Sequence, residues 1–150
     1  MTVKGYMLIG IPASGKSSYA KPLSKMIYSK IISTDLIRKE LYGSEEIQGN
    51  WKEIEATLHK KIFDCIEQNQ DFIIDGTHTV REHRKVLLNL DSRIEWTGIV
   101  YNIDKETAKD RNSKRTRKVP DTIINRMFAN LTKNPPEKKE GFHKIICYDM

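Results

Sequence analysis

The chain has 150 residues, 38% of them hydrophobic and 31% charged, which is the composition of one folded domain with its own core. No window approaches the roughly 18 continuous apolar residues of a membrane span, and the start lacks a secretory-signal pattern, so we expect a cytoplasmic protein without a membrane partner. The net charge of +6 favours an anionic partner without identifying it.

Strand-like and helix-like stretches alternate along the chain, which predicts an α/β fold on a mainly parallel sheet. We expect strands at residues 5–10, 30–33, 72–75, 94–103 and 144–148. The first and third are continuous apolar runs, as expected for strands that helices cover on both faces. No repeat or linker divides the chain, so residues 1–150 are expected to form a single domain.

Helices follow from the spacing of apolar residues. The first should bury Tyr19, Leu23, Met26 and Ile27. Pro22 lies within it and is expected to kink or interrupt it. Two later helices present apolar positions 54, 58, 62, 65 and 66, and 123, 124, 127, 128 and 131, and the last ends before two prolines. Cys65 and Cys147 lie in apolar stretches without metal-ligand spacing and are expected in the core.

The loop after the first strand carries the most specific motif of the chain. Residues 10–17 match G-x-x-x-x-G-K-S/T at every fixed position, between an apolar strand and a helical pattern. Glycine permits positive φ and a close approach, and a helix starting near Gly15 points its unpaired N–H groups at phosphates. Lys16 is expected to reach the β- and γ-phosphates and Ser17 to bind Mg²⁺. The predicted ligand is ATP or a related nucleoside triphosphate, bound by Gly10, Ala13, Ser14, Gly15, Lys16, Ser17 and Ser18.

Asp35 and Arg38 follow the second strand, whose carboxyl end should face the ligand crevice of an open parallel sheet. Asp35 is expected to start a helix, with Arg38 one turn further on the same face. One interpretation is that Asp35 takes the proton of an acceptor hydroxyl while Arg38 binds an anionic group of the acceptor. The alternative is a helix cap and a solvated surface charge.

Asp75 ends the third strand and is expected to serve Mg²⁺ through water, the alternative being a helix cap. The segment 75–77 also resembles the end of the D-x-D-G-T motif of aspartyl-phosphate phosphatases, but Ile73 stands where their nucleophile would be, which excludes that activity. Three basic residues follow, either as acceptor-phosphate contacts or as surface charge: Arg81, His83 and Arg84.

Residues 110–120 form a basic segment that predicts a lid over the triphosphate. Arg111 and Arg115 are four positions apart and can share one helix face, from which an arginine neutralises charge on the transferring phosphoryl group. We expect Arg111 to bind the nucleotide and Arg115 to bind it and assist catalysis. The alternative is a solvated charged turn, which is also the expectation for Arg117 and Lys118.

These segments together resemble the 5′-hydroxyl polynucleotide kinases, in particular the kinase domain of phage and bacterial end-healing enzymes. The resemblance runs through residues 10–17, Asp35 with Arg38, Asp75, Arg111-Asn-Ser-Lys-Arg115, Val119-Pro120 and Arg126-Met127. It implies that the loop lysine and serine bind ATP and Mg²⁺ and that Asp35 is the general base. It further implies that Arg38 contacts the phosphate beside the acceptor nucleoside, and that Arg111 and Arg115 contact ATP phosphates. Those relatives carry phosphatase or ligase domains that we do not expect in these 150 residues.

The sequence therefore predicts an α/β three-layer sandwich of the P-loop kinase type, with five mainly parallel strands and a helical lid. The expected reaction is Mg²⁺-dependent transfer of the γ-phosphate of ATP to the 5′-hydroxyl of a DNA or RNA end. One alternative is a kinase for a nucleoside, sugar or antibiotic hydroxyl. Another is a nucleotide-binding accessory module without transferase activity.

Overall fold

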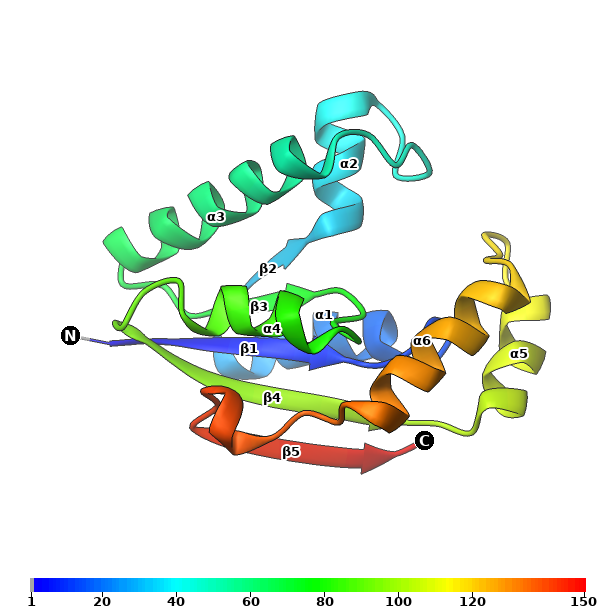
Figure 1. Ribbon diagram of the computed structural model, residues 1–150. Coiled ribbons are helices and arrows are strands. Elements are labelled where there is room, and N and C mark those ends of the chain that lie inside the picture. Colours follow the sequence, from blue (N-terminus) through cyan, green and yellow to red (C-terminus); the bar gives the residue numbers. More distant parts are fainter. Residues whose placement is uncertain (1) are drawn as a thin grey trace.

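The computed structural model describes residues 2–150 and contains a five-stranded, fully parallel sheet (Figure 1). The strand order is β2-β3-β1-β4-β5. The strands are β1 Val3–Ile9, β2 Lys30–Ser33, β3 Phe72–Asp75, β4 Ile94–Asn102 and β5 Lys144–Asp149. All five predicted strands are confirmed within two residues at each end, and the α/β class is confirmed with them.

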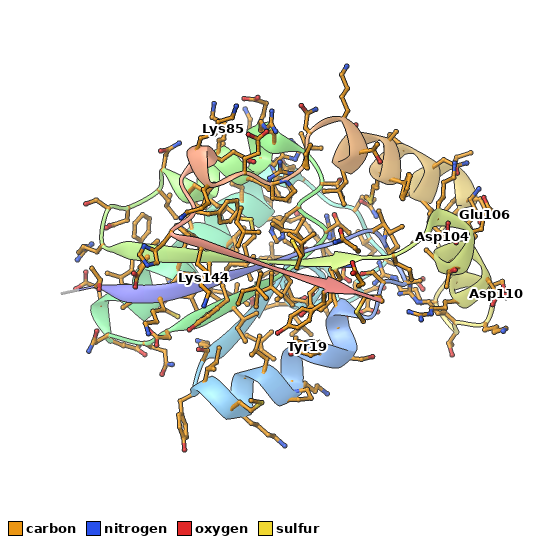
Figure 2. The ribbon with its side chains drawn as sticks, turned by 90° about the horizontal axis from the view of Figure 1, so that it is seen from below. Tyr19, Lys85, Asp104, Glu106, Asp110 and Lys144 are labelled. Carbon is orange, nitrogen blue, oxygen red and sulfur yellow. The ribbon has the colours of Figure 1, made fainter. Side chains whose placement is uncertain are left out.

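The helices are α1 Lys16–Ile27, α2 Thr34–Tyr42, α3 Trp51–Glu67, α4 Arg81–Leu88, α5 Lys105–Ser113 and α6 Asp121–Lys133, followed by the 3₁₀ turn η1 Lys138–Glu140. Helix α1 lies on one face of the sheet and α4 on the other, as the side chains of Tyr19 and Lys85 show (Figure 2). Helices α5 and α6 lie beyond the carboxyl ends of the strands (Figure 1). The arrangement is the predicted three-layer sandwich.

Two cores form because successive strand residues point to opposite faces. In β1, Met7 packs with α3 and α4 on one side, whereas Leu8 packs with α1 on the other. A third cluster, which includes Ile11 and Ile124, fixes α5 and α6 at the carboxyl edge. This third cluster holds the lid segment on the same side as the phosphate loop.

Two apolar residues that were expected in the core are exposed, and one proline has less effect on its helix than expected. Met26 was predicted to be buried but is 76% exposed, since within residues 2–150 no neighbouring element covers the last turn of α1 there. Cys65 is buried as predicted, but Cys147 is exposed because β5 is an edge strand that pairs only with β4. Helix α1 continues through Pro22 without interruption.

Within residues 2–150, no helix has both the length and the apolar composition of a bilayer-spanning segment.

Candidate active site

The loop between β1 and α1 has the conformation that a phosphate cradle requires. Gly15 is the N-cap of α1 with φ of 97°, and Ala13 is also left-handed with φ of 65°. A Cβ atom at Gly10 would lie 2.9 Å from the Ser14 hydroxyl oxygen, so any larger residue would displace the loop. Helix α1 therefore begins where the sequence predicts, with its first N–H groups at the loop.

Lys16 is held inside this loop. Its side chain is buried and its ammonium donates a hydrogen bond to the Ile11 carbonyl at 3.0 Å. Burial lowers the pKa of Lys16 to about 8, the nearby Arg115 acts in the same direction, and the carboxylates of Asp75 and Asp35 oppose it. A buried cation close to a second cation is stabilised by an anionic ligand, which is the property expected of a triphosphate site.

The side chains present fit a nucleotide phosphate group. The Ser14 hydroxyl is buried and has no hydrogen-bond partner among residues 2–150, and a buried polar atom of this kind normally has one. A phosphate oxygen in the loop would supply the missing partner. Ser17 and Ser18 are exposed at the start of α1, where their hydroxyls are accessible to a ligand.

Ser17 and Asp75 fit a Mg²⁺ ion carried by the nucleotide. Within the described chain no group of three or more acidic, histidine or cysteine side chains could hold a metal. Mg²⁺ bound to phosphates needs only one or two protein ligands, because phosphate oxygens and water complete its octahedron. Burial raises the pKa of Asp75, Lys16 opposes the rise, Asp35 adds to it, and a hydrogen bond from Ser17 lowers the pKa.

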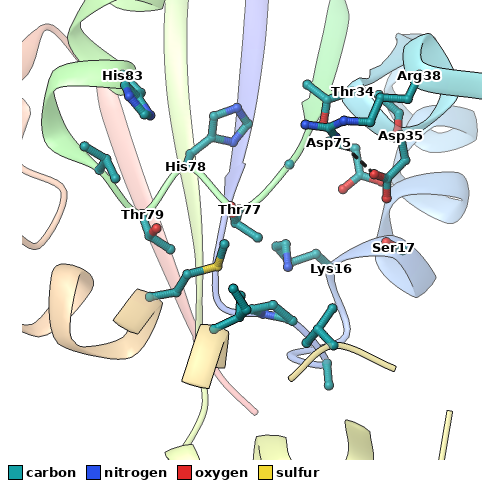
Figure 3. Close-up of a pocket in the computed structure, with 18 of the residues that line it drawn as sticks. Lys16, Ser17, Thr34, Asp35, Arg38, Asp75, Thr77, His78, Thr79 and His83 are labelled. Carbon is teal, nitrogen blue, oxygen red and sulfur yellow. Dashed lines mark hydrogen bonds and ion pairs between the residues drawn. The ribbon is translucent and has the colours of Figure 1, made fainter. Parts of the chain in front are cut away.

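Asp35 lies in the first turn of α2, close to where the sequence places it, but it does not cap the helix. Ser33 is the N-cap, and its hydroxyl accepts a hydrogen bond from the Leu36 N–H at 3.3 Å. The Asp35 carboxylate is therefore not used by the helix end, and it lies beside Asp75 and Arg38 in the cavity (Figure 3). Arg38 Nη1 is 3.3 Å from Asp35 Oδ1, so the predicted pair is in contact.

Arg117 is a residue of the site that its sequence context does not indicate. It was expected to be a solvated surface charge, but its Nη1 lies 3.0 Å from Asp35 Oδ2. The two residues are 82 positions apart, and a local sequence pattern cannot predict a contact between residues so far apart in the chain. Arg117 thus joins the acceptor side of the site, whereas Lys118 is exposed as expected.

The lid segment differs in one respect from its prediction. Helix α5 ends at Ser113, so Arg115 lies in the following turn and does not share a helix face with Arg111. Both arginines nevertheless line the same cavity as Lys16. Asn112, which sequence reasoning also missed, is buried and clamps the turn: its amide donates to the Val119 carbonyl at 2.7 Å and accepts from the Val119 N–H at 3.1 Å.

The basic residues at the start of α4 have different roles from one another. Arg84 is fully buried, so it neither contacts an acceptor nor lies in solvent. It donates to Glu140 at 2.9 Å, the Asn134 carbonyl at 2.9 Å and the His78 carbonyl at 3.0 Å. Arg81 forms an ion pair with Glu137 at 2.9 Å. Only His83 of this group of three lines the cavity, with its ring centroid 6.4 Å from that of Trp51.

His78 ties the loop after β3 to the phosphate loop. Its Nδ1 lies 2.7 Å from the Leu8 carbonyl, and the neighbouring Thr77 carbonyl accepts a hydrogen bond from the Gly10 N–H at 3.0 Å. Burial lowers the pKa of His78 to about 4, and the positive charges of Lys16 and Arg84 act in the same direction. The imidazole is therefore neutral at pH 7 and donates from Nδ1.

We expect His78 to make stability depend on pH. An exposed histidine has a pKa of about 6.5 and this one of about 4, so in that interval the unfolded chain binds a proton that the folded chain does not. This contribution is complete above pH 6.5 and falls by up to about 3 kcal/mol as the pH drops to 4. His78→Asn keeps an N–H donor, tolerates the left-handed backbone and cannot titrate. Denaturant unfolding of both proteins across this range should give the smaller loss for His78→Asn, and equal losses would contradict a buried neutral imidazole.

A single cavity of about 1140 Å³ connects these groups. It runs from the phosphate loop past Asp35 and Asp75 to a partly apolar wall that includes Trp51, Val80 and Met127. Pockets for one small ligand usually have volumes of roughly 300–1,000 Å³, so this cavity has room for a nucleotide and a second substrate. The predicted acceptor pair and most of the predicted nucleotide-binding residues thus face one common space, whereas Gly10 and Ser14 do not line it.

A phosphate-binding loop directly after the central strand β1, on a parallel sheet of order β2-β3-β1-β4-β5, defines a P-loop domain of the kinase type. A family model described as an AAA domain matches residues 6–134, and the chain belongs to this family.

Known proteins of similar sequence or structure include several kinases. An L-seryl-tRNA(Sec) kinase from Methanococcus maripaludis is 27% identical over 132 residues, which are 83% of this chain and 51% of that protein. A chain from a Pnkp1/Rnl/Hen1 RNA repair complex has a TM-score of 0.76 at 16% identity, covering 88% of this chain and 45% of that one. A sugar kinase from Janibacter sp. HTCC2649 has a TM-score of 0.72 at 18% identity, covering 99% and 86%. The chain thus spans about half the length of the first two proteins.

Proposed function

We propose that this chain transfers the γ-phosphate of ATP to a hydroxyl group held beside Asp35. The observation that supports this most is the position of the Asp35 carboxylate in the same cavity as the buried Lys16 ammonium, close enough for each charge to influence the other. A phosphate bound at Lys16 and an alcohol bound at Asp35 would therefore share one space. The kinase-type fold and the AAA-domain family support the use of a nucleotide.

In the proposed reaction, Asp35 accepts a hydrogen bond from the acceptor hydroxyl and orients its oxygen towards the γ-phosphorus. A bond forms between this oxygen and phosphorus while the bond from phosphorus to the β–γ bridging oxygen breaks, the proton passes to Asp35, and ADP leaves. Lys16 and Arg115 balance the negative charge on the phosphates as it shifts. When bound between Ser17 and, through water, Asp75, Mg²⁺ would supply further charge neutralisation.

For the acceptor we propose the 5′-hydroxyl of a nucleic-acid end. Arg38 places a guanidinium group beside Asp35, where it can bind the phosphate that follows a terminal nucleoside. The net charge of +6 and the size of the cavity are in keeping with a polyanionic acceptor. The names of two similar proteins, a seryl-tRNA kinase and a chain of an RNA repair complex, support a hydroxyl carried by RNA.

A transfer assay with γ-labelled ATP tests this proposal. We expect label to pass to RNA or DNA oligonucleotides with a 5′-hydroxyl and not to matched oligonucleotides that already carry a 5′-phosphate. The apparent affinity for the oligonucleotide should fall steeply between about 50 and about 200 mM salt, because phosphate contacts release counterions. If no oligonucleotide accepts label while ATP is bound, the proposed acceptor is wrong.

The second candidate is a kinase for a small-molecule hydroxyl. It is favoured by the similarity in fold to the sugar kinase, which extends over 99% of this chain and 86% of that one. The same assay with nucleosides and sugars separates the candidates. A neutral small acceptor should show little dependence of its KM on salt, in contrast to an oligonucleotide.

A further inference from the structure

Arg117 crosses the cavity from the lid to the opposite wall. It lies in the turn between α5 and α6, and its Nη1 is 3.0 Å from Asp35 Oδ2 on α2 and 3.3 Å from Glu45 Oε1 in the loop after α2. Its Nη2 also donates to the Glu45 carbonyl at 3.4 Å. One side chain therefore connects the lid to the wall that carries the candidate base.

This contact leaves Asp35 with a guanidinium group on each oxygen. Arg38 takes Oδ1 at 3.3 Å and Arg117 takes Oδ2 at 3.0 Å. A carboxylate acting on an alcohol must accept its hydrogen bond, and Arg117 covers the approach to Oδ2 from the lid side. Arg117 thus takes one of the two acceptor positions of Oδ2 and reduces its basicity, so Oδ2 acts better as a base towards the acceptor hydroxyl once Arg117 has moved.

The contacts of Arg117 suit a side chain that exchanges partners. The side chains of Arg117, Asp35 and Glu45 are 30%, 44% and 43% exposed, and ion pairs this accessible to water contribute little to stability. The planar fork of arginine binds carboxylate and phosphate with the same geometry. An acceptor phosphate could therefore take the place of Asp35 and Glu45 as the partner of the Arg117 guanidinium group.

We propose that Arg117 is a gate for the acceptor: it holds Asp35 while the acceptor site is empty and moves to the phosphate beside the acceptor hydroxyl when the acceptor binds. This rests on the proposed function. While the acceptor site is empty, Arg117 holds Oδ2 and weakens its action as a base on a water molecule, and its second position selects acceptors that carry a phosphate. Arg117 is thus a positioning and specificity residue for the acceptor, separate from the lid arginines Arg111 and Arg115, which face the nucleotide.

The first test measures ATP hydrolysis without any acceptor. Arg117→Ala should raise this rate roughly fivefold, which corresponds to about 1 kcal/mol, because Oδ2 of Asp35 is then free to accept a hydrogen bond from an attacking water molecule. Lys118→Ala is the matched control, since it removes a neighbouring exposed charge and should leave the rate unchanged. Thermal melting of both variants checks that they fold. An unchanged or lower rate in Arg117→Ala overturns the gate.

The second test locates the position of Arg117 after the acceptor binds. We compare a 5′-hydroxyl oligonucleotide with one whose first internucleotide linkage is a neutral methylphosphonate, in wild type and in Arg117→Ala. In the wild type, the neutral linkage should raise the KM for the oligonucleotide roughly tenfold. In Arg117→Ala, the neutral linkage should raise the KM for the oligonucleotide by a clearly smaller factor than in the wild type. The KM for ATP should be the same in both proteins. Equal effects in both proteins overturn the proposed phosphate contact.

The two tests separate failure of this inference from failure of the proposed function. If wild type transfers label to no oligonucleotide, the proposed acceptor is wrong, and acceptor-free hydrolysis still decides whether Arg117 limits the use of Asp35 Oδ2 as a base. If transfer occurs and Arg117→Ala raises only the KM for ATP, Arg117 binds the nucleotide, and the gate is wrong while the kinase proposal stands.

Discussion

Replacing Asp35 with Asn is expected to lower the rate of phosphoryl transfer by about 10²- to 10⁴-fold, because the amide cannot take the proton of the acceptor hydroxyl. The amide has nearly the shape of the carboxylate, so the cavity should be preserved. Nucleotide affinity should change little, since the phosphate loop and its Lys16 are intact. Initial rates with γ-labelled ATP at saturating acceptor, together with a nucleotide-binding titration, measure the two effects separately.

Glu45→Gln is the matched control for this change. Glu45 is another partly exposed carboxylate that contacts Arg117, but the proposed reaction gives it no proton to accept. Its saturated transfer rate should stay within a few-fold of wild type. A wild-type rate in Asp35→Asn would remove Asp35 as the base. A wild-type protein that binds ATP and phosphorylates no acceptor would instead favour an accessory module.

The largest expected effect on stability is at Arg84. Arg84→Met should lower the free energy of unfolding by about 3–5 kcal/mol, because it leaves the buried Glu140 with only the longer ion pair to Arg81 at 3.7 Å and removes the donor to two carbonyls. Arg84 is 0% exposed and Glu140 3%, and the guanidinium also serves the carbonyls of His78 and Asn134. Denaturant unfolding followed by circular dichroism measures the change.

Two further variants sharpen this experiment. Arg93 pairs with Asp91 at 2.8 Å but is half exposed, so Arg93→Met should barely alter unfolding. The double variant Arg84→Met with Glu140→Gln should recover part of the loss, since it removes a buried charge that Arg81 alone compensates poorly. If Arg84→Met lowers the free energy of unfolding as little as Arg93→Met does, the buried pair does not support the loop that carries His78.

Much of the nucleotide half of the site could be predicted because its chemistry is local. The residues 10–17 are consecutive, so their spacing alone indicates the loop, the start of α1 and the place of Lys16. The parallel sheet follows in the same way from short apolar runs that alternate with helical periodicity. The place of Asp35 and Asp75 at the crevice could be predicted because Asp75 ends β3 and Asp35 comes two residues after β2, and the carboxyl ends of parallel strands meet at one edge.

The remaining features depend on contacts between distant segments. The alternation of charges around Arg84 gives no sign that it is buried, because its partner Glu140 is 56 positions away. The sequence around Asn112 shows only a basic segment and does not predict a structural role for it. In the folded turn, both the nitrogen and the oxygen of its side-chain amide form hydrogen bonds with the backbone of Val119. The same limit explains Met26 and Cys147, whose exposure depends on where neighbouring elements end.

Consecutive residues and strand ends are enough to predict the phosphate loop, the parallel α/β architecture and two carboxylates at the crevice. Which cation contacts which anion depends instead on how distant segments pack in the folded chain. Arg117, and not a residue near it in sequence, completes the surroundings of Asp35, because folding of the lid over α2 brings together charges that are 82 positions apart.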